Sequence, residues 1–307
     1  MILDAQKIQA ICPNYESHLP LAKEASTREF YRIFQKNGPS LILMQNTDDS
    51  HNITQIIQSQ KKLLACGINT PEYHKYSIDE GWVLQEDAGS THLLTYAMKQ
   101  GFTDQYQTAI SHIIRLQTRV SHTNLPTYTE TGLIKEAMLF VQEFLPTVGL
   151  SSHLNTQIIM SIRALCKDIS QTPQTVIHKD FHSTNLLVHN DSVYVVDQQD
   201  MCIGPWTYDL ASLLFDCYVD WPWPIKQLLM QDFKAKHPHL PNSDLSFDLH
   251  LCALQRHLKC LGLFIRLARN GKPRYLSHCG LIKQRLLTLC DQLPQYGIFK
   301  IPVEMSL

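Results

Sequence analysis

The sequence predicts an α+β fold in two lobes, a small β-rich lobe over residues 1–88 and a larger, mostly α-helical lobe over residues 89–307. Two patterns predict it: short apolar runs between turn residues fill the first part of the chain, and apolar residues at helical spacing fill the rest. A composition of 44% hydrophobic and 18% charged residues supplies enough apolar side chains for both lobes.

The first lobe is predicted as a small sheet with one long helix. Asn37-Gly38-Pro39 is a turn signal, and the apolar run SLILMQN follows it as the third strand. Asn52 is predicted to cap the helix, whose apolar residues recur at helical spacing, and Gly67 is predicted to end it. The predicted strands are 19–24, 29–35, 40–46, 72–77 and 81–87.

Helical patterns dominate after Gly89. The clearest lies at 248–269, where Leu254, Leu258 and Leu261 belong to one apolar stripe. Short β-like pieces interrupt the helices in the middle of the chain. The other predicted helices are 92–99, 103–121, 130–145, 153–170 and 207–219, and the β-like pieces are 175–181, 185–190 and 192–197.

Charge and cysteine usage exclude several classes of protein. The net charge of −1 gives no overall field toward nucleic acid or an anionic membrane. The sequence has neither an apolar run of about 18 residues nor the basic-then-apolar start of a secretory signal. The nine cysteines include no pair at the C-x-x-C spacing of redox or zinc sites. We therefore expect a cytoplasmic protein with reduced thiols that binds neither nucleic acid nor membrane; its protein partners are left open.

The chemically informative stretch is VIHKDFHSTNLLVHNDSVYVVDQQD, residues 176–200. Asp180 and Asn185 lie five positions apart, and Asp197 follows a hydrophobic hairpin. Phosphoryl transfer needs a carboxylate beside the attacking hydroxyl, and it needs oxygen ligands that hold Mg²⁺ against the phosphates. Any one of the three could merely end a strand or cap a turn. All three in this order, between apolar segments, favour a kinase in which Asp180 is catalytic and Asn185 and Asp197 bind the metal.

These residues also carry a family resemblance. HKDFHSTNLL resembles the catalytic loop of the aminoglycoside phosphotransferase and choline kinase superfamily, and VVDQQD and GPWTYDLASLLFD resemble the segments that follow it. The resemblance implies a protein-kinase-like bilobal fold with ATP and Mg²⁺ as cofactors. It implies that Asp209, together with His178, supports the catalytic loop rather than reacting, although a cap at the start of a helix is the alternative for Asp209.

A second resemblance concerns the acceptor. QRHLKCLGLFIRLARNGKPRYLSH, residues 255–278, resembles the C-terminal signature of the bacterial cell-wall amino-sugar kinases. These enzymes phosphorylate the anomeric hydroxyl of N-acetylmuramate and N-acetylglucosamine in peptidoglycan recycling, and the likeness extends over about residues 20–290. It implies a sugar 1-kinase. A kinase for choline, an aminoglycoside or another sugar remains open, as does a nucleotide-binding pseudokinase.

The sequence departs from the kinase pattern at the phosphate-binding elements. It contains no G-x-G-x-x-G, so Ser26, Thr27 and Arg28 are assigned to the ATP phosphates, with an ordinary polar hairpin as the alternative. Met44 stands where the third strand should carry a lysine. Arg28 and Arg32 are the cations that could replace that lysine.

The remaining assignments are positional. Gln85 and Glu86 lie where the segment between the lobes should offer backbone groups to adenine. Asp216 and Asp220, four apart, are expected on a helix near the acceptor. The residues assigned to the acceptor are His182, Gln199, Asp200 and Arg256, and for each of these candidates a solvated or structurally paired side chain is the alternative.

Overall fold

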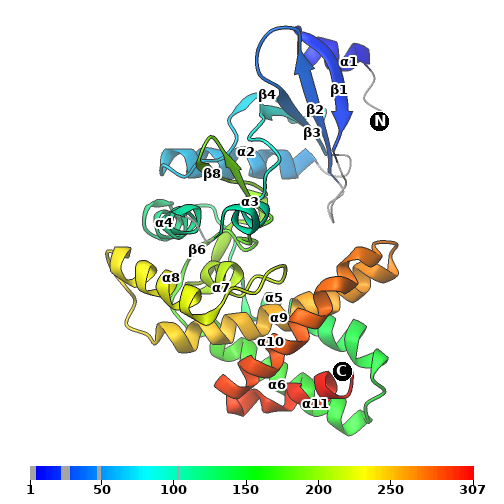
Figure 1. Ribbon diagram of the computed structural model, residues 1–307, viewed down its shortest axis with the longest axis vertical. Helices are drawn as coiled ribbons and strands as arrows, with labels where there is room; N and C mark the ends of the chain where they lie inside the picture. The colour runs from blue at the N-terminus through cyan, green and yellow to red at the C-terminus, as the bar shows by residue number, and fades with distance from the viewer. Residues whose placement is uncertain (1–4, 22–27, 47–49, 102–103) are drawn as a thin grey trace. The chain divides into compact units, whose positions relative to one another are not determined.

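The computed structural model describes residues 5–21, 28–46, 50–101 and 104–307 (Figure 1). The chain forms two compact units. The first comprises Met1–Lys99 and Thr184–Gln199, and the second comprises Gln100–Ser183 and Asp200–Leu307. This division differs from the predicted lobes, since the first unit also includes residues 89–99 and the segment that follows the predicted catalytic loop.

The first unit is built on a five-stranded antiparallel sheet in the order β1-β2-β3-β5-β4. The first strand begins at Tyr15, earlier than the predicted 19–24, and residues 22–24 of that prediction lie outside the described residues. The other four strands fall within a residue or two of their predicted positions. The strands are β1 (Tyr15–Pro20), β2 (Glu29–Gln35), β3 (Leu41–Gln45), β4 (Tyr73–Ser77) and β5 (Trp82–Glu86).

A helix packs on each face of this sheet. Residues of α1 (Ala5–Ile11), which the sequence did not predict, pack with Leu43 and Leu84. The next residues along these strands, Met44 and Val83, point to the other face and pack with α2 (Ser50–Ala65). Asn52 lies inside α2, so the predicted cap is wrong. Gly67 has a φ of +72°, which agrees with its predicted place at the end of the helix.

The hairpin predicted after the catalytic loop is present in the first unit as β7 (Leu186–His189) and β8 (Ser192–Val195). Its two turn residues, Asn190 and Asp191, have φ values of 48° and 58°. Asn and Asp tolerate this left-handed conformation, and such two-residue turns match the twist of paired strands. The hairpin is tied to the unit by hydrogen bonds from Val195 N to Asn69 O (2.8 Å) and from Val188 N to Thr91 O (2.8 Å).

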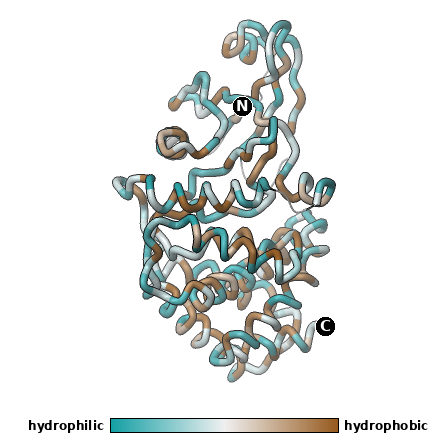
Figure 2. The backbone as a smooth tube through the Cα atoms, turned by 60° about the vertical axis from the view of Figure 1, so that its left-hand side comes forward, coloured by the Kyte–Doolittle hydropathy of each residue, from teal (hydrophilic) through white to brown (hydrophobic). Residues whose placement is uncertain are grey.

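The second unit is mainly helical, and most residues of its long helix α9 (Leu245–Arg269) are buried. Asp244 caps this helix by accepting from the backbone N–H groups of Ser246 and Phe247. Along the helices polar and apolar residues alternate, as expected where one face is buried (Figure 2). The remaining helices are α3 (Leu93–Gln100, across the unit boundary), α4 (Asp104–Arg119), α5 (Glu130–Leu139), α6 (Ser152–Ser170), α7 (Tyr208–Leu214), α8 (Trp223–Lys236), α10 (Cys279–Gln292) and α11 (Lys300–Glu304).

The predicted helix 130–145 changes its winding halfway. It is an α-helix to Leu139 and a π-helix over Phe140–Phe144. Gly262 of α9 lies against this junction, because a Cβ added there would be 2.2 Å from the Leu139 carbonyl oxygen. The lack of a side chain at Gly262 thus allows the two helix backbones to approach closely.

Two elements near the predicted catalytic loop differ from expectation. The strand β6 (Gln174–Ile177) pairs with β9 (Cys202–Pro205), which the sequence did not predict. Helix α7 ends at Leu214, whereas the sequence predicted a helix to residue 219. None of the helices in the described residues combines the length and hydropathy needed to cross a membrane.

Candidate active site

The backbone of the predicted catalytic loop is held in an uncommon conformation just before Asp180. Lys179 has a φ of 79°, in the left-handed region that residues with a side chain seldom adopt. Its N–H donates to Asp209 Oδ1 at 2.9 Å, and its carbonyl accepts from Arg256 Nη1 at 3.1 Å. Such a conformation persists only where its surroundings fix it. Here a carboxylate and a guanidinium fix the peptide groups on both sides of Lys179.

Asp209 lies in the first turn of α7 and is fully buried. Its carboxylate accepts from the backbone N–H of His178 at 2.6 Å as well as from that of Lys179. Burial raises the pKa of Asp209, although His178 and these two N–H donors act in the opposite direction. These bonds give Asp209 the geometry that the predicted supporting role requires.

His178 contributes to this arrangement through its backbone. Its side chain is buried, and among the described residues neither ring nitrogen has a hydrogen-bond partner. The ring packs edge-on against Phe181 at 5.8 Å between centroids. The contacts that fit the support expected of His178 are the hydrogen bond from its N–H to Asp209 and the packing of its ring.

Asp180 follows this fixed peptide and lies among cations. Burial alone would raise the pKa of its carboxyl group, but Lys259, His182 and Arg256, in that order, together with His178, hold that pKa well below its usual range. Lys259 Nζ lies 3.9 Å from Asp180 Oδ1. Asp180 is thus ionised at neutral pH and is a weak base, suited to orienting a hydroxyl group.

The predicted metal ligands, Asn185 and Asp197, both belong to the first unit and flank the β7–β8 hairpin. At the base of this hairpin Val196 N donates to Asn185 O at 3.1 Å, so the two segments lie side by side. Asp197 has a φ of 68°, and its side chain is 36% exposed. An amide and a carboxylate carried by two adjacent backbone segments supply the kinds of oxygen ligand that fit Mg²⁺.

The two arginines considered for the ATP phosphates have different partners. Arg32 forms a two-pronged ion pair with Asp87, with 2.7 Å from Nε to Oδ2 and 3.2 Å from Nη2 to Oδ1. Arg28 is buried, and it pairs with the Asp197 carboxylate and donates to Gln199 Oε1 at 2.9 Å. Of the two, Arg28 therefore lies beside a predicted metal ligand. The predicted phosphate ligands Ser26 and Thr27 lie outside the described residues.

Met44, which stands where a lysine was expected, is part of the apolar packing on one face of the sheet. Its side chain is 2% exposed and packs with Ile53, Ile56 and Val83 between β3 and α2. A lysine at this position would destabilise the fold if its ammonium group stayed among these apolar neighbours, because burying an unpaired charge is costly. The charge that a lysine would supply must therefore come from another element.

Gln85 and Glu86 lie in β5, which pairs with β3 on one side and with β4 on the other. The Glu86 N–H donates to Glu72 O at 2.8 Å, and the Glu86 carboxylate accepts from Tyr194 OH at 3.1 Å. The Glu86 N–H is therefore committed within the unit, which weakens the prediction that it is a donor to adenine.

The residues assigned to the acceptor are divided between the two units. Gln199 belongs to the first unit, where Arg28 holds its side chain, whereas Asp200 is exposed in the second. In the second unit His182 lies edge-on to Tyr218, with 5.6 Å between ring centroids. Arg256 is 4% exposed, so its contact with the Lys179 carbonyl favours support of the loop over contact with a sugar.

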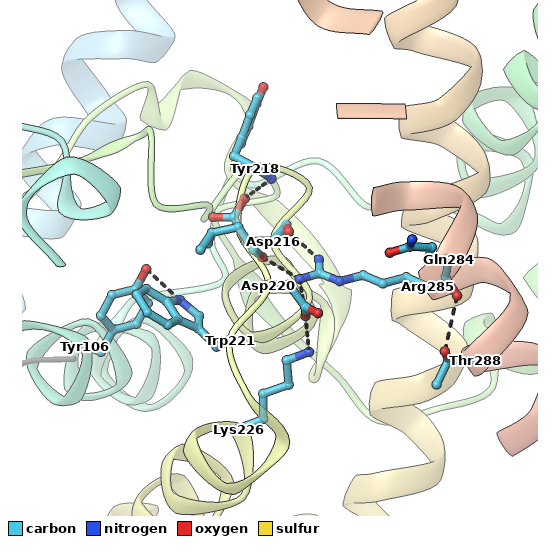
Figure 3. A network of polar contacts seen from close by, with 10 residues as sticks. Tyr106, Asp216, Tyr218, Asp220, Trp221, Lys226, Gln284, Arg285 and Thr288 are labelled. Carbon is cyan, nitrogen blue, oxygen red and sulfur yellow. Dashed lines mark hydrogen bonds and ion pairs between the residues drawn. The ribbon is translucent and has the colours of Figure 1, made fainter. Parts of the chain in front are cut away.

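The prediction that Asp216 and Asp220 lie on a helix is wrong, because both lie in the loop between α7 and α8 (Figure 3). Asp216 is buried and accepts from the N–H groups of Ser183, at 2.8 Å, and Tyr218, at 2.9 Å. Such side chain-to-backbone bonds compete with helix formation. Arg285 donates to the carbonyl oxygens of Asp216 and Val219.

Asp216 is thus a second support of the catalytic loop, since it also accepts from the Ser183 hydroxyl at 2.5 Å. The sequence analysis missed this role. Asp216 is the last residue of GPWTYDLASLLFD, the segment that resembles the kinase superfamily, but that resemblance does not identify the partner of its carboxylate.

Comparison with known proteins identifies the family of the chain. Residues 17–237 match the model of the phosphotransferase enzyme family. The chain is 27% identical over 288 residues to the "N-acetylmuramate/N-acetylglucosamine kinase" of Pseudomonas aeruginosa, covering 90% of this chain and 85% of that protein. The protein of the same name from Neisseria meningitidis is 26% identical over 319 residues, covering 95% and 92%.

Solved structures share the fold at lower identity. A choline/ethanolamine kinase family protein from Mesorhizobium loti superposes with a TM-score of 0.67 at 13% identity, covering 96% of this chain and 95% of that one. A GDP complex of aminoglycoside 2'-phosphotransferase-IIIa gives 0.64 at 16% identity, covering 91% and 96%. The family match covers well over half of the residues, and the chain therefore belongs to the phosphotransferase enzyme family.

Proposed function

We propose that this phosphotransferase is an ATP- and Mg²⁺-dependent kinase that phosphorylates the anomeric hydroxyl group of N-acetylmuramate, N-acetylglucosamine or both. The observation that carries the proposal is the similarity to three relatives named "N-acetylmuramate/N-acetylglucosamine kinase", which extends over 83–95% of this chain. It includes the loop in which Asp209 and Arg256 fix the peptide before Asp180. Peptidoglycan recycling is the process in which we expect such a product to be used.

In the proposed reaction the anomeric hydroxyl attacks the γ-phosphate of ATP in line with the leaving oxygen. Asp180 accepts a hydrogen bond from this hydroxyl and orients it, and it takes the proton late, because its low pKa makes it a weak base. Arg28 contributes positive charge toward the phosphates. Mg²⁺ bound by Asn185 and Asp197 would offset the negative charge on the β- and γ-phosphoryl oxygens.

Two features support the choice of cofactors. An amicoumacin kinase of the same fold, with a TM-score of 0.58, was solved with AMP-PNP and Ca²⁺. In the present chain the backbones of Asn185 and Val196 meet at the base of one hairpin, which supports the assignment of Asn185 and Asp197 to one metal ion. We further propose a cytoplasmic location, because all nine cysteines are free thiols and eight are buried.

A coupled assay of ADP release over N-acetylmuramate, N-acetylglucosamine, glucose, choline and kanamycin tests the proposal. We expect turnover with one or both N-acetylated sugars and a loss of about 10²–10⁴-fold in Asp180→Asn, the range associated with a positioned acid or base. Activity on choline or kanamycin alone would replace the proposal with a kinase for another alcohol. ATP binding without acceptor-dependent ADP release would indicate a pseudokinase.

A further inference from the structure

A buried lysine on α9 lies close to the catalytic loop. Lys259 Nζ is 2.8 Å from Glu136 Oε2 and 3.9 Å from Asp180 Oδ1, and its side chain is only 13% exposed. It follows Arg256 by three residues, so the two cations lie on one face of the helix. One of them holds the peptide before Asp180, and the other lies beside the Asp180 carboxylate.

The two lysines beside Glu136 are balanced only when Asp180 is included, with Arg256 set against the Asp209 carboxylate. Glu136 is shared by two ammonium groups, since Lys179 Nζ lies 3.0 Å from its Oε1, and Tyr128 OH donates to its Oε2 at 2.6 Å. One carboxylate neutralises one of the two lysines and leaves one positive charge in a largely buried place. Buried charges are costly unless they are paired. Asp180 is the carboxylate that pairs with the remaining charge.

We propose that Lys259 is a positioning residue for phosphoryl transfer, which orients the Asp180 carboxylate toward the acceptor hydroxyl through its ion pair with Oδ1. This inference rests on the proposed function. The 3.9 Å between Lys259 Nζ and Asp180 Oδ1 is the distance of an ion pair and is too long for a hydrogen bond. Lys259 therefore restrains the carboxylate by charge attraction and does not transfer a proton to it. Glu136 fixes the ammonium group that does this.

Other groups also face Asp180, and the role of Lys259 must be separated from theirs. His182 and His178 come from the loop itself, and Arg256 comes from α9. Burial alone would raise the pKa of Asp180, and of these side chains Lys259 opposes burial most strongly. Removal of Lys259 should therefore raise the pKa of Asp180, whereas a lysine elsewhere in the unit should have no such effect.

Lys259→Met tests the inference against a matched control, Lys226→Met. Lys226 is also a largely buried lysine of the second unit, with a side chain 9% exposed, but its partner is Asp220 at 2.9 Å. We expect Lys259→Met to lower kcat with the sugar about 10–100-fold while the Kd for ATP changes less than about 3-fold, because misplacement of a reacting group reduces turnover by up to about 10²-fold. We also expect the acid limb of its kcat/KM–pH profile to move to higher pH.

Lys226→Met should lower the melting temperature without moving the acid limb of the kcat/KM–pH profile. If Lys259→Met behaves as Lys226→Met does, with wild-type kcat and an unmoved limb, Lys259 is structural and the inference is overturned. Lys259→Gln serves if the methionine variant does not fold, because its amide can still donate to Glu136 while the charge beside Asp180 is lost. We expect the same two effects from it, and their absence would overturn the inference equally. A wild-type protein inactive on every acceptor would instead refute the proposed function.

Discussion

Replacing Asp209 by Ala removes the acceptor of two N–H groups, the buried one of His178 and the partly buried one of Lys179. An orphaned buried donor costs about 1–3 kcal/mol, so the free energy of unfolding should fall by about 2–6 kcal/mol. A domain of the size of the second unit loses about 2–4 °C in melting temperature per kcal/mol, which predicts a decrease of roughly 5–20 °C. Turnover should also fall by about 10²-fold, because the peptide that sets the position of Asp180 is released.

Calorimetry and the ADP-release assay measure the two effects separately. Asp209→Asn keeps one acceptor oxygen but turns an amide N–H₂ toward the other donor, so both losses should be intermediate. Asp291→Ala is the control, because its side chain is 61% exposed and its ion pair with Lys300 lies on the surface; its melting temperature should change by no more than about 1–2 °C. An Asp209→Ala protein that melts like wild type and retains its turnover would refute this reasoning.

Three further predictions follow from the contacts. Arg28→Met should weaken ATP binding by about 10-fold or more in calorimetry, since it removes a charged donor. Arg32→Met should chiefly lower the melting temperature, because it removes the cationic partner of the largely buried Asp87 carboxylate. Equal ATP affinities in the two variants would contradict the assignment of Arg28. Gly262→Ala places a Cβ 2.2 Å from the Leu139 carbonyl oxygen. We expect the free energy of unfolding, measured with denaturant, to fall by about 1–3 kcal/mol or more. An unchanged unfolding midpoint would show that the two helices can move apart at no cost. Chelation by EDTA should abolish ADP release and added Mg²⁺ should restore it, and full activity in EDTA would exclude Asn185 and Asp197 as ligands of an essential ion.

Most of the element order could be predicted, although α1 and β9 were missed, because many elements have a local cause. Asn190 and Asp191 form a turn that needs only their own backbone preferences, and the apolar spacing of α9 is independent of its neighbours. The failures come from long-range contacts. Helix α7 ends early because Asp216 bonds to the backbone of Ser183, 33 residues away, and no local pattern contains that partner.

The same distinction applies to the candidate site. The order of Asp180, Asn185 and Asp197 is visible in the sequence because a short hairpin separates the last two. Lys259 could not be assigned, because its connection to Asp180 crosses from α9 to the loop and depends on Glu136. The separation of three residues from Arg256 places both on one helix face, but it does not reveal what that face meets.

The position of the transferred phosphate tests the central claim most directly. After incubation with ATP, Mg²⁺ and N-acetylmuramate or N-acetylglucosamine, ³¹P–¹H correlation NMR of the purified product should couple the new phosphorus to the proton on C1 of the sugar. The Asp180→Asn protein should yield little or none of this product. A phosphate on any other sugar oxygen, or the same amount of product from the variant, would contradict the account.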